Sequence, residues 1–170
     1  MSAASQAPSE RPLYRHTQRG TLMIASFMLA GAFVLHQLIQ GGASWLWALL
    51  AVAVAIGFTF SSLTVTITSS VLTAAFTPGW PRKVERLENI AQAHVVRNPW
   101  YYGWGIRLTP HGTLYNVSGL DAVEIRTKQG KTFRIGTDEP EALVQAIQRA
   151  TGRSVGMESK PGAYPSPQVK

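Results

Sequence analysis

No aspartate, glutamate, lysine or arginine occurs between Arg19 and Arg82, a gap of 62 residues in a chain of 170. About a quarter of the residues of an average soluble domain are charged, so such a domain would not leave this gap. The gap contains two apolar runs, Thr21 to Ile39 and Ala43 to Phe60. Each is about as long as a helix must be to cross roughly 30 Å of hydrocarbon. The sequence therefore predicts a transmembrane helical hairpin at residues 21–60, with spans at about 21–39 and 43–60.

The short connector, residues 40–42, makes the two spans antiparallel neighbours, and the positions of the basic residues predict their orientation. Arginines precede the first span and follow the second, while the connector has none, so the positive-inside rule places both chain termini in the cytoplasm. Residues 1–20 are then a cytoplasmic N-terminal tail. A cleaved signal peptide is the competing interpretation of residues 1–39, which the length of the apolar run and the second run directly after it disfavour.

Three polar residues, His36, Gln37 and Gln40, lie near the outer end of the first span. An ionisable group inside a membrane is a functional candidate. Here the cluster lies within one turn of the connector. We therefore expect these residues to lie at the membrane surface rather than to form a proton or metal site.

After the second run the pattern changes to strict alternation, which is typical of strands. Leu63, Val65 and Ile67 alternate with threonines, and the alternation resumes at Leu72 after a Ser69-Ser70 turn. Residues 82–87 and 94–97 are predicted as further strands.

Two later segments predict β-hairpins with three-residue loops. Pro110-His111-Gly112 would place Leu108 opposite Leu114 and Arg107 opposite Tyr115.

The loop of the second hairpin is Lys128-Gln129-Gly130. That loop pairs Ile125 with Phe133, Val123 with Ile135, and Glu124 with Arg134. The last pair is expected to be a surface ion pair that contributes under about 1 kcal/mol.

A final amphipathic helix is predicted between Asp138 and Gly152. Asp138 and Glu141 have the spacing of a capping box, Pro140 suits a first turn, and Gly152 suits the end of a helix. One stripe of the helix is apolar: Leu143, Ala146, Ile147 and Ala150. Residues 153–170 lack periodicity and are predicted to be a disordered tail.

Six or seven antiparallel strands and one helix predict a small α+β domain, a sheet or barrel closed at one end. Three segments carry a resemblance: NPWYYGWGIR (98–107), NVSGLDAVE (116–124) and RIGTDEP (134–140). With the preceding spans, they resemble small bacterial membrane proteins that have a pleckstrin-homology-like (PH-like) domain after a transmembrane hairpin. The resemblance implies a partly open, seven-stranded PH-like barrel at residues 62–152, in the bacterial cytoplasmic membrane. It implies no catalytic residues.

The residue types favour a protein that is not an enzyme and has no metal or cofactor. The chain has no cysteine, and its four histidines show no metal-ligand spacing. No pair of carboxylates is placed for acid–base catalysis. A hydrolase that uses Ser118 or His111 is the catalytic alternative.

The segment 98–119 is rich in aromatic residues, and three interpretations are open. Its side chains form sheet core, or a belt at the membrane interface, or a platform for stacking on a ligand. Its basic residues are too few for a nucleic-acid-binding stripe. The candidate contacts with the membrane interface or a partner are Trp80, Trp100, Tyr101, Tyr102, Trp104, Arg97 and Arg107.

The function predicted from these features is a non-enzymatic, membrane-anchored PH-like module. It would mediate protein or membrane-surface interactions on the cytoplasmic side. The expected partners are the lipid bilayer and another membrane or cytoplasmic protein or a second copy of this chain, with no nucleic acid. The alternative is an accessory subunit of a membrane enzyme or transporter complex that acts through its transmembrane helices.

Overall fold

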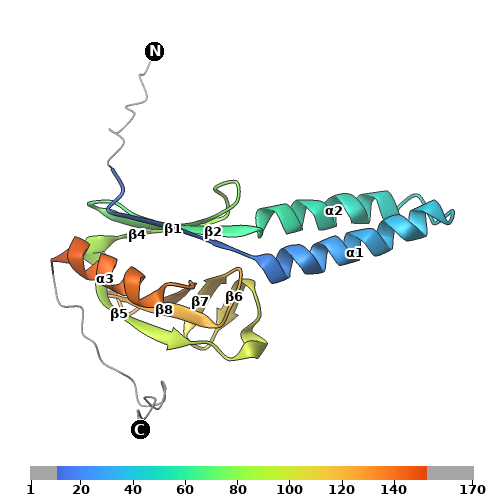
Figure 1. Cartoon of the computed structure of the whole chain (residues 1–170). Coiled ribbons are helices and arrows are strands. Elements are labelled where there is room, and N and C mark those ends of the chain that lie inside the picture. The colour runs from blue at the N-terminus through green and yellow to red at the C-terminus, as the bar shows by residue number, and fades with distance from the viewer. Residues whose placement is uncertain (1–10, 153–170) are drawn as a thin grey trace, which may run out of the picture.

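The computed structural model describes residues 11–152 (Figure 1). Within them the chain forms three α-helices, nine strands and two single-turn 3₁₀ helices. The helices are α1 (Thr21–Ile39), α2 (Leu46–Thr59) and α3 (Pro140–Thr151), with η1 (Leu87–Asn89) and η2 (Trp100–Tyr102). The strands are β1 (Tyr14–Arg19), β2 (Ser62–Ile67), β3 (Val71–Phe76), β4 (Arg82–Arg86), β5 (Ile90–Arg97), β6 (Gly105–Thr109), β7 (Gly112–Asn116), β8 (Asp121–Thr127) and β9 (Thr132–Gly136). The predicted tail at residues 153–170 lies outside the described residues.

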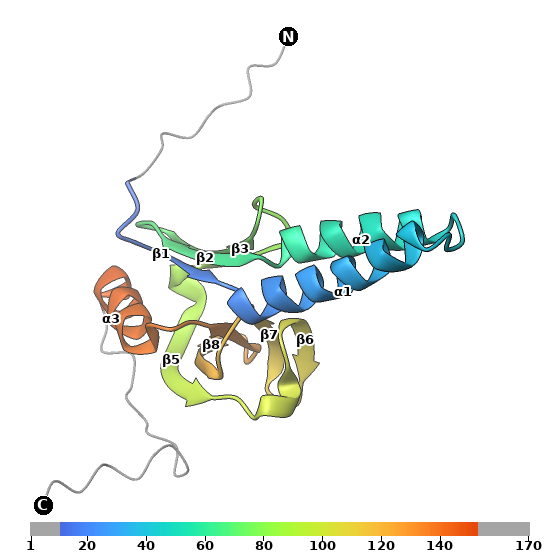
Figure 2. The same ribbon diagram turned by 45° about the vertical axis from the view of Figure 1, so that its right-hand side comes forward.

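The strands form two sheets, and the fold is α+β. The first has the order β1-β2-β3-β4 and is antiparallel. The second has the order β5-β8-β9-β7-β6, and its β7 and β9 are parallel, so the prediction of purely antiparallel pairing was wrong. Between residues 11 and 152 no strand pairing joins the two sheets, so they do not close into a barrel. In Figures 1 and 2, α3 and the α1–α2 hairpin lie at opposite ends of the β layers.

The helical hairpin is inserted between two paired strands. β1 runs antiparallel to β2 over its whole length, with Arg19 opposite Ser62, and only Gly20 separates β1 from α1. The prediction of a simple tail at residues 1–20 is therefore wrong for residues 14–19, which belong to the β domain together with residues 62–152. The sequence YRHTQR has no apolar alternation, so its strand depends on pairing with β2 rather than on its own pattern.

Neither α1 nor α2 has a buried residue. Among the described residues, α1 is the one helix long and apolar enough, by length and composition, to cross a membrane. α2 is apolar but has 14 residues, shorter than the predicted span at 43–60. The two helices approach closely where Gly57 lies against Phe27, because glycine has no side chain to keep them apart.

The core of the β domain lies between the sheets and under α3. The alternation predicted for β2 and β3 is confirmed, because Leu63, Val65, Ile67, Leu72, Ala74 and Phe76 are all buried. From α3, Leu143, Ala146 and Ile147 complete this core, and so does Val144, which the predicted stripe omitted.

The register predicted for the second hairpin is confirmed, and that of the first is wrong by one residue. Ile125 pairs with Phe133, and Glu124 with Arg134, as expected. In the first hairpin, however, Leu108 pairs with Thr113 because the loop has two residues rather than three. Gly112 directly follows this loop and is the first residue of β7, with φ +95°. A Cβ on Gly112 would overlap the backbone of Thr132 in β9. The close approach of β9 requires glycine there, and sequence reasoning assigned that glycine to the turn alone.

The predicted capping box of α3 is also wrong. Glu139 is the N-cap residue, no side chain caps the helix, and Asp138 instead contacts His16 in β1. Pro140 in the first turn and Gly152 at the C-cap, in the left-handed conformation, agree with the prediction.

Candidate membrane-interface surface

The strand registers determine which loops lie at the same end of the domain as the helical hairpin. Two residues separate the end of α2 from the start of β2, and β3 returns antiparallel to β2, so that Phe76 lies opposite Leu63. The β3–β4 loop, residues 77–81, therefore lies at the hairpin end. The opposite, or distal, end contains the β2–β3 turn at residues 69–70.

The second sheet reaches the hairpin end through β5 and β6. Gly20, at the start of α1, lies against the backbone and Cβ of Val117. Gly105, the first residue of β6, is near the ring of Phe60, and that ring packs edge-on against Phe76 at 4.9 Å. The segment between β5 and β6, which contains η2, is thus held beside the hairpin. Figures 1 and 2 show this yellow-green segment on the hairpin side of the second sheet, away from α3.

Three aromatic side chains project from these two loops. Trp100 is 79% exposed, Tyr101 68% and Trp80 74%. The interpretation of the aromatic segment as sheet core is therefore wrong for Trp100 and Tyr101. Trp100 packs edge-on against Tyr101, and Tyr101 packs edge-on against Tyr102, so the three rings of η2 form one continuous group.

The other two aromatic residues of the predicted set support the loop instead of projecting from it. Tyr102 and Trp104 are partly buried. The indole nitrogen of Trp104 is buried and has no hydrogen-bond partner among the described residues. Arg107, on β6, donates a hydrogen bond from Nε to the carbonyl oxygen of Trp104 at 3.1 Å. Arg107 is therefore held at the end of the loop that contains η2.

A buried polar network anchors the η2 loop to the sheet. Asn98, which is 3% exposed, accepts a hydrogen bond from Arg134 Nη1 at 2.9 Å, and its backbone N–H donates to Leu120. Arg134 also contacts Glu124, at 2.6 Å from Nη2 and 2.8 Å from Nε. The pair predicted to be at the surface is thus nearly buried, with side-chain exposures of 8% and 13%. The pattern of the two strands showed the pairing, but not that Asn98 and His94 would also contact the pair.

Arg97 is exposed at the end of β5, opposite Asp121, and directly precedes this anchored loop. The structure therefore brings together six of the seven predicted residues in one loop region, and places Trp80 on the first sheet at the same end. Sequence reasoning missed Arg19 and Arg82 as members of this surface. Arg19 ends β1 beside α1, and Arg82 begins β4 one register step from Phe76.

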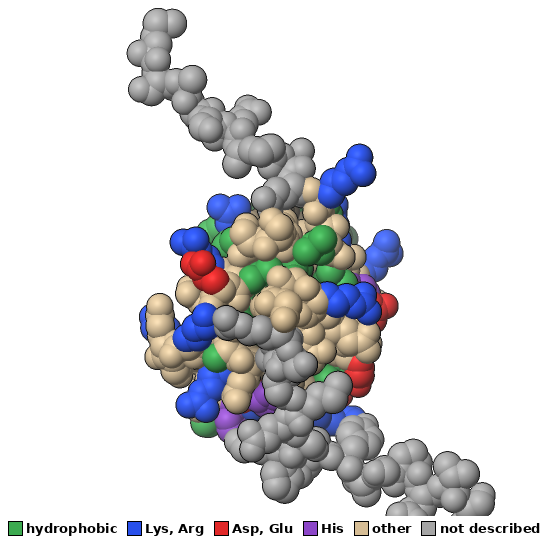
Figure 3. Space-filling model, turned by 90° about the vertical axis from the view of Figure 1, so that its left-hand side faces the viewer, with side chains coloured by type: hydrophobic (Ala, Val, Ile, Leu, Met, Phe, Trp, Pro, Cys, Tyr) green, Lys and Arg blue, Asp and Glu red, His purple; other side chains and the backbone are tan. Residues whose placement is uncertain are grey.

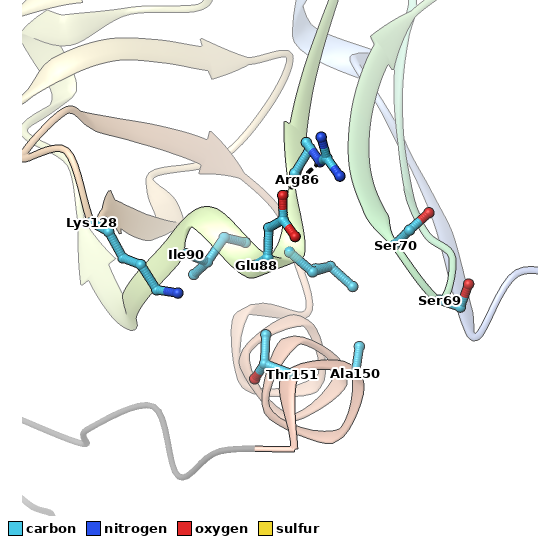
Figure 4. Close-up of a pocket in the computed structure, with 9 residues that line it drawn as sticks. Ser69, Ser70, Arg86, Glu88, Ile90, Lys128, Ala150 and Thr151 are labelled. Carbon is cyan, nitrogen blue, oxygen red and sulfur yellow. Dashed lines mark ion pairs between the residues drawn. The ribbon is translucent and has the colours of Figure 1, made fainter.

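The distal end carries a shallow pocket of about 340 Å³. Figure 4 shows Ser69 and Ser70 on one side of it, Lys128 on the other and the end of α3 below. Arg86 and Glu88 lie between them as an exposed ion pair at 2.9 Å. Viewed from this end, the surface shows lysine and arginine side chains around its outline and only small hydrophobic areas (Figure 3). The two ends of the domain therefore differ in their chemistry.

A second charged cluster joins β1 to the start of α3. His16 Nε2 lies 2.6 Å from Asp138, and His16 Nδ1 lies 3.3 Å from Glu139. Burial raises the pKa of the neighbouring Tyr14 to about 12, and the charges of Glu139 and Asp138 add to the rise. Among the described residues, no group of three or more histidines and carboxylates could hold a metal ion.

The residues named for a hydrolase do not come together. Ser118 follows β7 and His111 precedes it, so about 15 Å of strand separates them. Proton transfer needs hydrogen-bond reach. Ser118 lies instead in a turn held by Asn116, whose side chain accepts a hydrogen bond from the backbone N–H of Ser118 and donates one to the carbonyl oxygen of Gly119.

Comparisons with family models, curated proteins and solved structures found no match to this chain.

Proposed function

We propose that the chain is a non-enzymatic, membrane-anchored module. The α1–α2 hairpin crosses the bacterial cytoplasmic membrane and holds a PH-like β domain on the cytoplasmic side for contact with a protein or the membrane surface. The observation that carries the proposal is the exposure of the hairpin. Its exposed large apolar side chains include Leu22, Met28, Leu29, Phe33, Leu35, Ile39, Trp45, Trp47, Leu49, Val52, Val54, Ile56 and Phe58.

Such a surface is unfavourable in water. Burial of one large apolar side chain contributes roughly 1.5–3 kcal/mol, and soluble monomers rarely expose contiguous apolar patches above a few hundred Å². The hairpin carries no charge, projects from the domain in Figure 1 and buries nothing against it. A bilayer supplies the apolar surroundings that the protein itself does not.

The length of α2 is compatible with a second span. Its 14 residues extend about 21 Å. Residues 43–45 extend its start by about one turn, because the N–H groups of Leu46 and Trp47 bond to the carbonyls of Ala43 and Ser44, three residues earlier. Residues 43–60 then cover about 27 Å, close to the ~30 Å of a hydrocarbon core. The pairing of β1 with β2 supports the same proposal, because it holds both ends of the hairpin at one side.

The test is cysteine accessibility, since the chain has no cysteine of its own. Single variants Ser44→Cys, between α1 and α2 at the outer end of the hairpin, and Gln129→Cys, in the β8–β9 turn, are expressed in full-length protein and treated with a membrane-impermeant maleimide. We expect Ser44→Cys to react in intact spheroplasts and Gln129→Cys only after lysis. Val54→Cys, within α2, is the control and should remain unreacted in both. Reaction of Gln129→Cys before lysis, or release of the protein by alkaline carbonate, would contradict the proposal.

A further inference from the structure

We propose that the β domain docks on the same bilayer that holds its hairpin, with η2 and the β3–β4 loop inserted among the headgroups of anionic lipids. This inference rests on the proposed function, because it needs the hairpin in the membrane. It adds a specific partner, the anionic lipid surface, and a specific orientation of the domain. The aromatic group of η2 is then a second point of membrane attachment.

The first argument is position. The β3–β4 loop and the η2 segment lie on different sheets, yet both lie at the hairpin end. Short connections link the hairpin to β1 and β2, through Gly20 on one side and through Phe60 and Ser61 on the other. Phe60 also packs on Phe76 in the core, so the domain cannot swing freely away from the lipid surface. The two loops are therefore held toward the headgroup layer.

The second argument is the kind of side chain exposed there. Trp and Tyr favour the membrane–water interface because their rings are apolar at one end and polar at the other. Trp80, Trp100 and Tyr101 are each more than two-thirds exposed, although aromatic residues are usually largely buried in a domain. The exposure ends at Tyr102, whose ring packs against Tyr101 and is partly buried. The tip of η2 is thus apolar and its base is fixed by Asn98.

The third argument is charge. Arg97 and Arg107 flank the aromatic tip, and Arg19 and Arg82 lie at the same end on the first sheet. Asp121 lies opposite Arg97 in the strand register and offsets part of this charge. A basic residue near an anionic leaflet contributes about 1 kcal/mol. The surface therefore fits anionic lipid better than a neutral one, and better than an acidic peptide, which would leave the three projecting aromatic rings in water.

The test uses the full-length chain in nanodiscs of phosphatidylcholine, with or without about 30% phosphatidylglycerol. Tyr101→Cys is labelled with an environment-sensitive fluorophore, and quenching is measured with headgroup spin-labelled lipid and with aqueous iodide. Gln129→Cys, at the distal end, is labelled in the same way, and Val54→Cys, in the hairpin, is labelled and tested with lipid that carries the spin label in its acyl chain. We expect strong lipid quenching at Tyr101 in anionic discs, several-fold above that at Gln129, with iodide quenching in the reverse order.

A charge-matched pair of variants tests the role of the arginines. Arg97→Gln with Arg107→Gln should reduce lipid quenching at position 101 severalfold, to near its value in discs of phosphatidylcholine alone. Lys128→Gln with Lys131→Gln removes the same charge from the exposed distal turn and should change nothing. Equal effects of the two pairs would overturn the inference, because net charge rather than the docking surface would then be responsible.

The outcomes separate this inference from the proposed function. Lipid contact at Val54 without contact at Tyr101 overturns docking and leaves the hairpin in the membrane. Absence of lipid contact at Val54 contradicts the proposed function itself. Quenching at Tyr101 that is equal in neutral and anionic discs overturns the assignment to anionic lipid. Protection of Tyr101 from both quenchers overturns docking in favour of a contact with protein, for which a second copy of the chain is the first candidate.

Discussion

The helical hairpin and the β domain that it interrupts place their apolar side chains in opposite ways. The hairpin has no charged residue, buries no side chain within the protein and turns its apolar surface outward. The β domain buries its apolar side chains between two sheets and α3, and even buries most of an ion pair. The difference shows that hydrophobic composition alone does not define a core. What matters is whether the partner for an apolar surface lies in the same chain or in the surroundings.

The largest expected effect on the protein as a whole, its loss from the membrane, follows from a charge in the hairpin. Leu29 lies near the middle of α1 and is 75% exposed. Under the proposed membrane placement, the charge of Leu29→Arg must enter hydrocarbon, which costs about 2.5–3.5 kcal/mol on insertion scales. We expect most of the protein to be lost from the carbonate-resistant membrane fraction, whereas Leu29→Phe should remain there. Unchanged membrane integration of Leu29→Arg would show that the hairpin finds its partner in protein or water.

The second effect concerns the buried pair of the β domain. Arg134→Met leaves the Glu124 carboxylate nearly buried without its main partner, which typically destabilises by about 3–5 kcal/mol. Chemical denaturation of the full chain in detergent measures this loss. Arg149→Met, on the exposed face of α3, is the control and should change stability little. The double variant Glu124→Met with Arg134→Met should be more stable than Arg134→Met alone, because no unpaired charge remains.

The smallest effect is a pH dependence at β4. Burial opposes the charge of Glu85, but hydrogen bonds from Lys83 and Asn89 outweigh burial and hold the pKa of this carboxyl below its ordinary value of 4.5. A carboxyl with a lowered pKa stabilises the fold above its ordinary pKa and loses that contribution as the pH falls through the folded value. Glu85→Gln should therefore be less stable than the native chain at pH 7, by under about 1 kcal/mol. The two stabilities should converge as the pH falls below 4.5 and through the lowered pKa of Glu85 in the folded chain. A constant difference across this range would mean that packing, rather than the charge, is responsible.

Local patterns predicted much of the fold because they depend on neighbours in the chain. The alternation in β2 and β3 and the register around residues 128–130 depend on period-two patterning, and both are confirmed. The register predicted for the first hairpin was wrong because Gly112 pairs with Thr109 as a strand residue and lies against β9, a contact that the turn pattern does not show. For the candidate site, the sequence predicted seven contact residues. Only the structure separates the projecting Trp80, Trp100 and Tyr101 from Tyr102 and Trp104, which are partly buried and support the loop.

The sequence by itself determined the division of this protein into an uncharged apolar hairpin and a charged, alternating β domain. Charge and hydropathy are properties of each residue, so no contact is needed to read them. The tertiary structure alone decided that residues 14–19 complete the first sheet, that β9 is parallel to β7, and that Asp138 contacts His16 instead of capping α3. These features join residues far apart in the chain, and their free energy comes from contacts that no local pattern encodes.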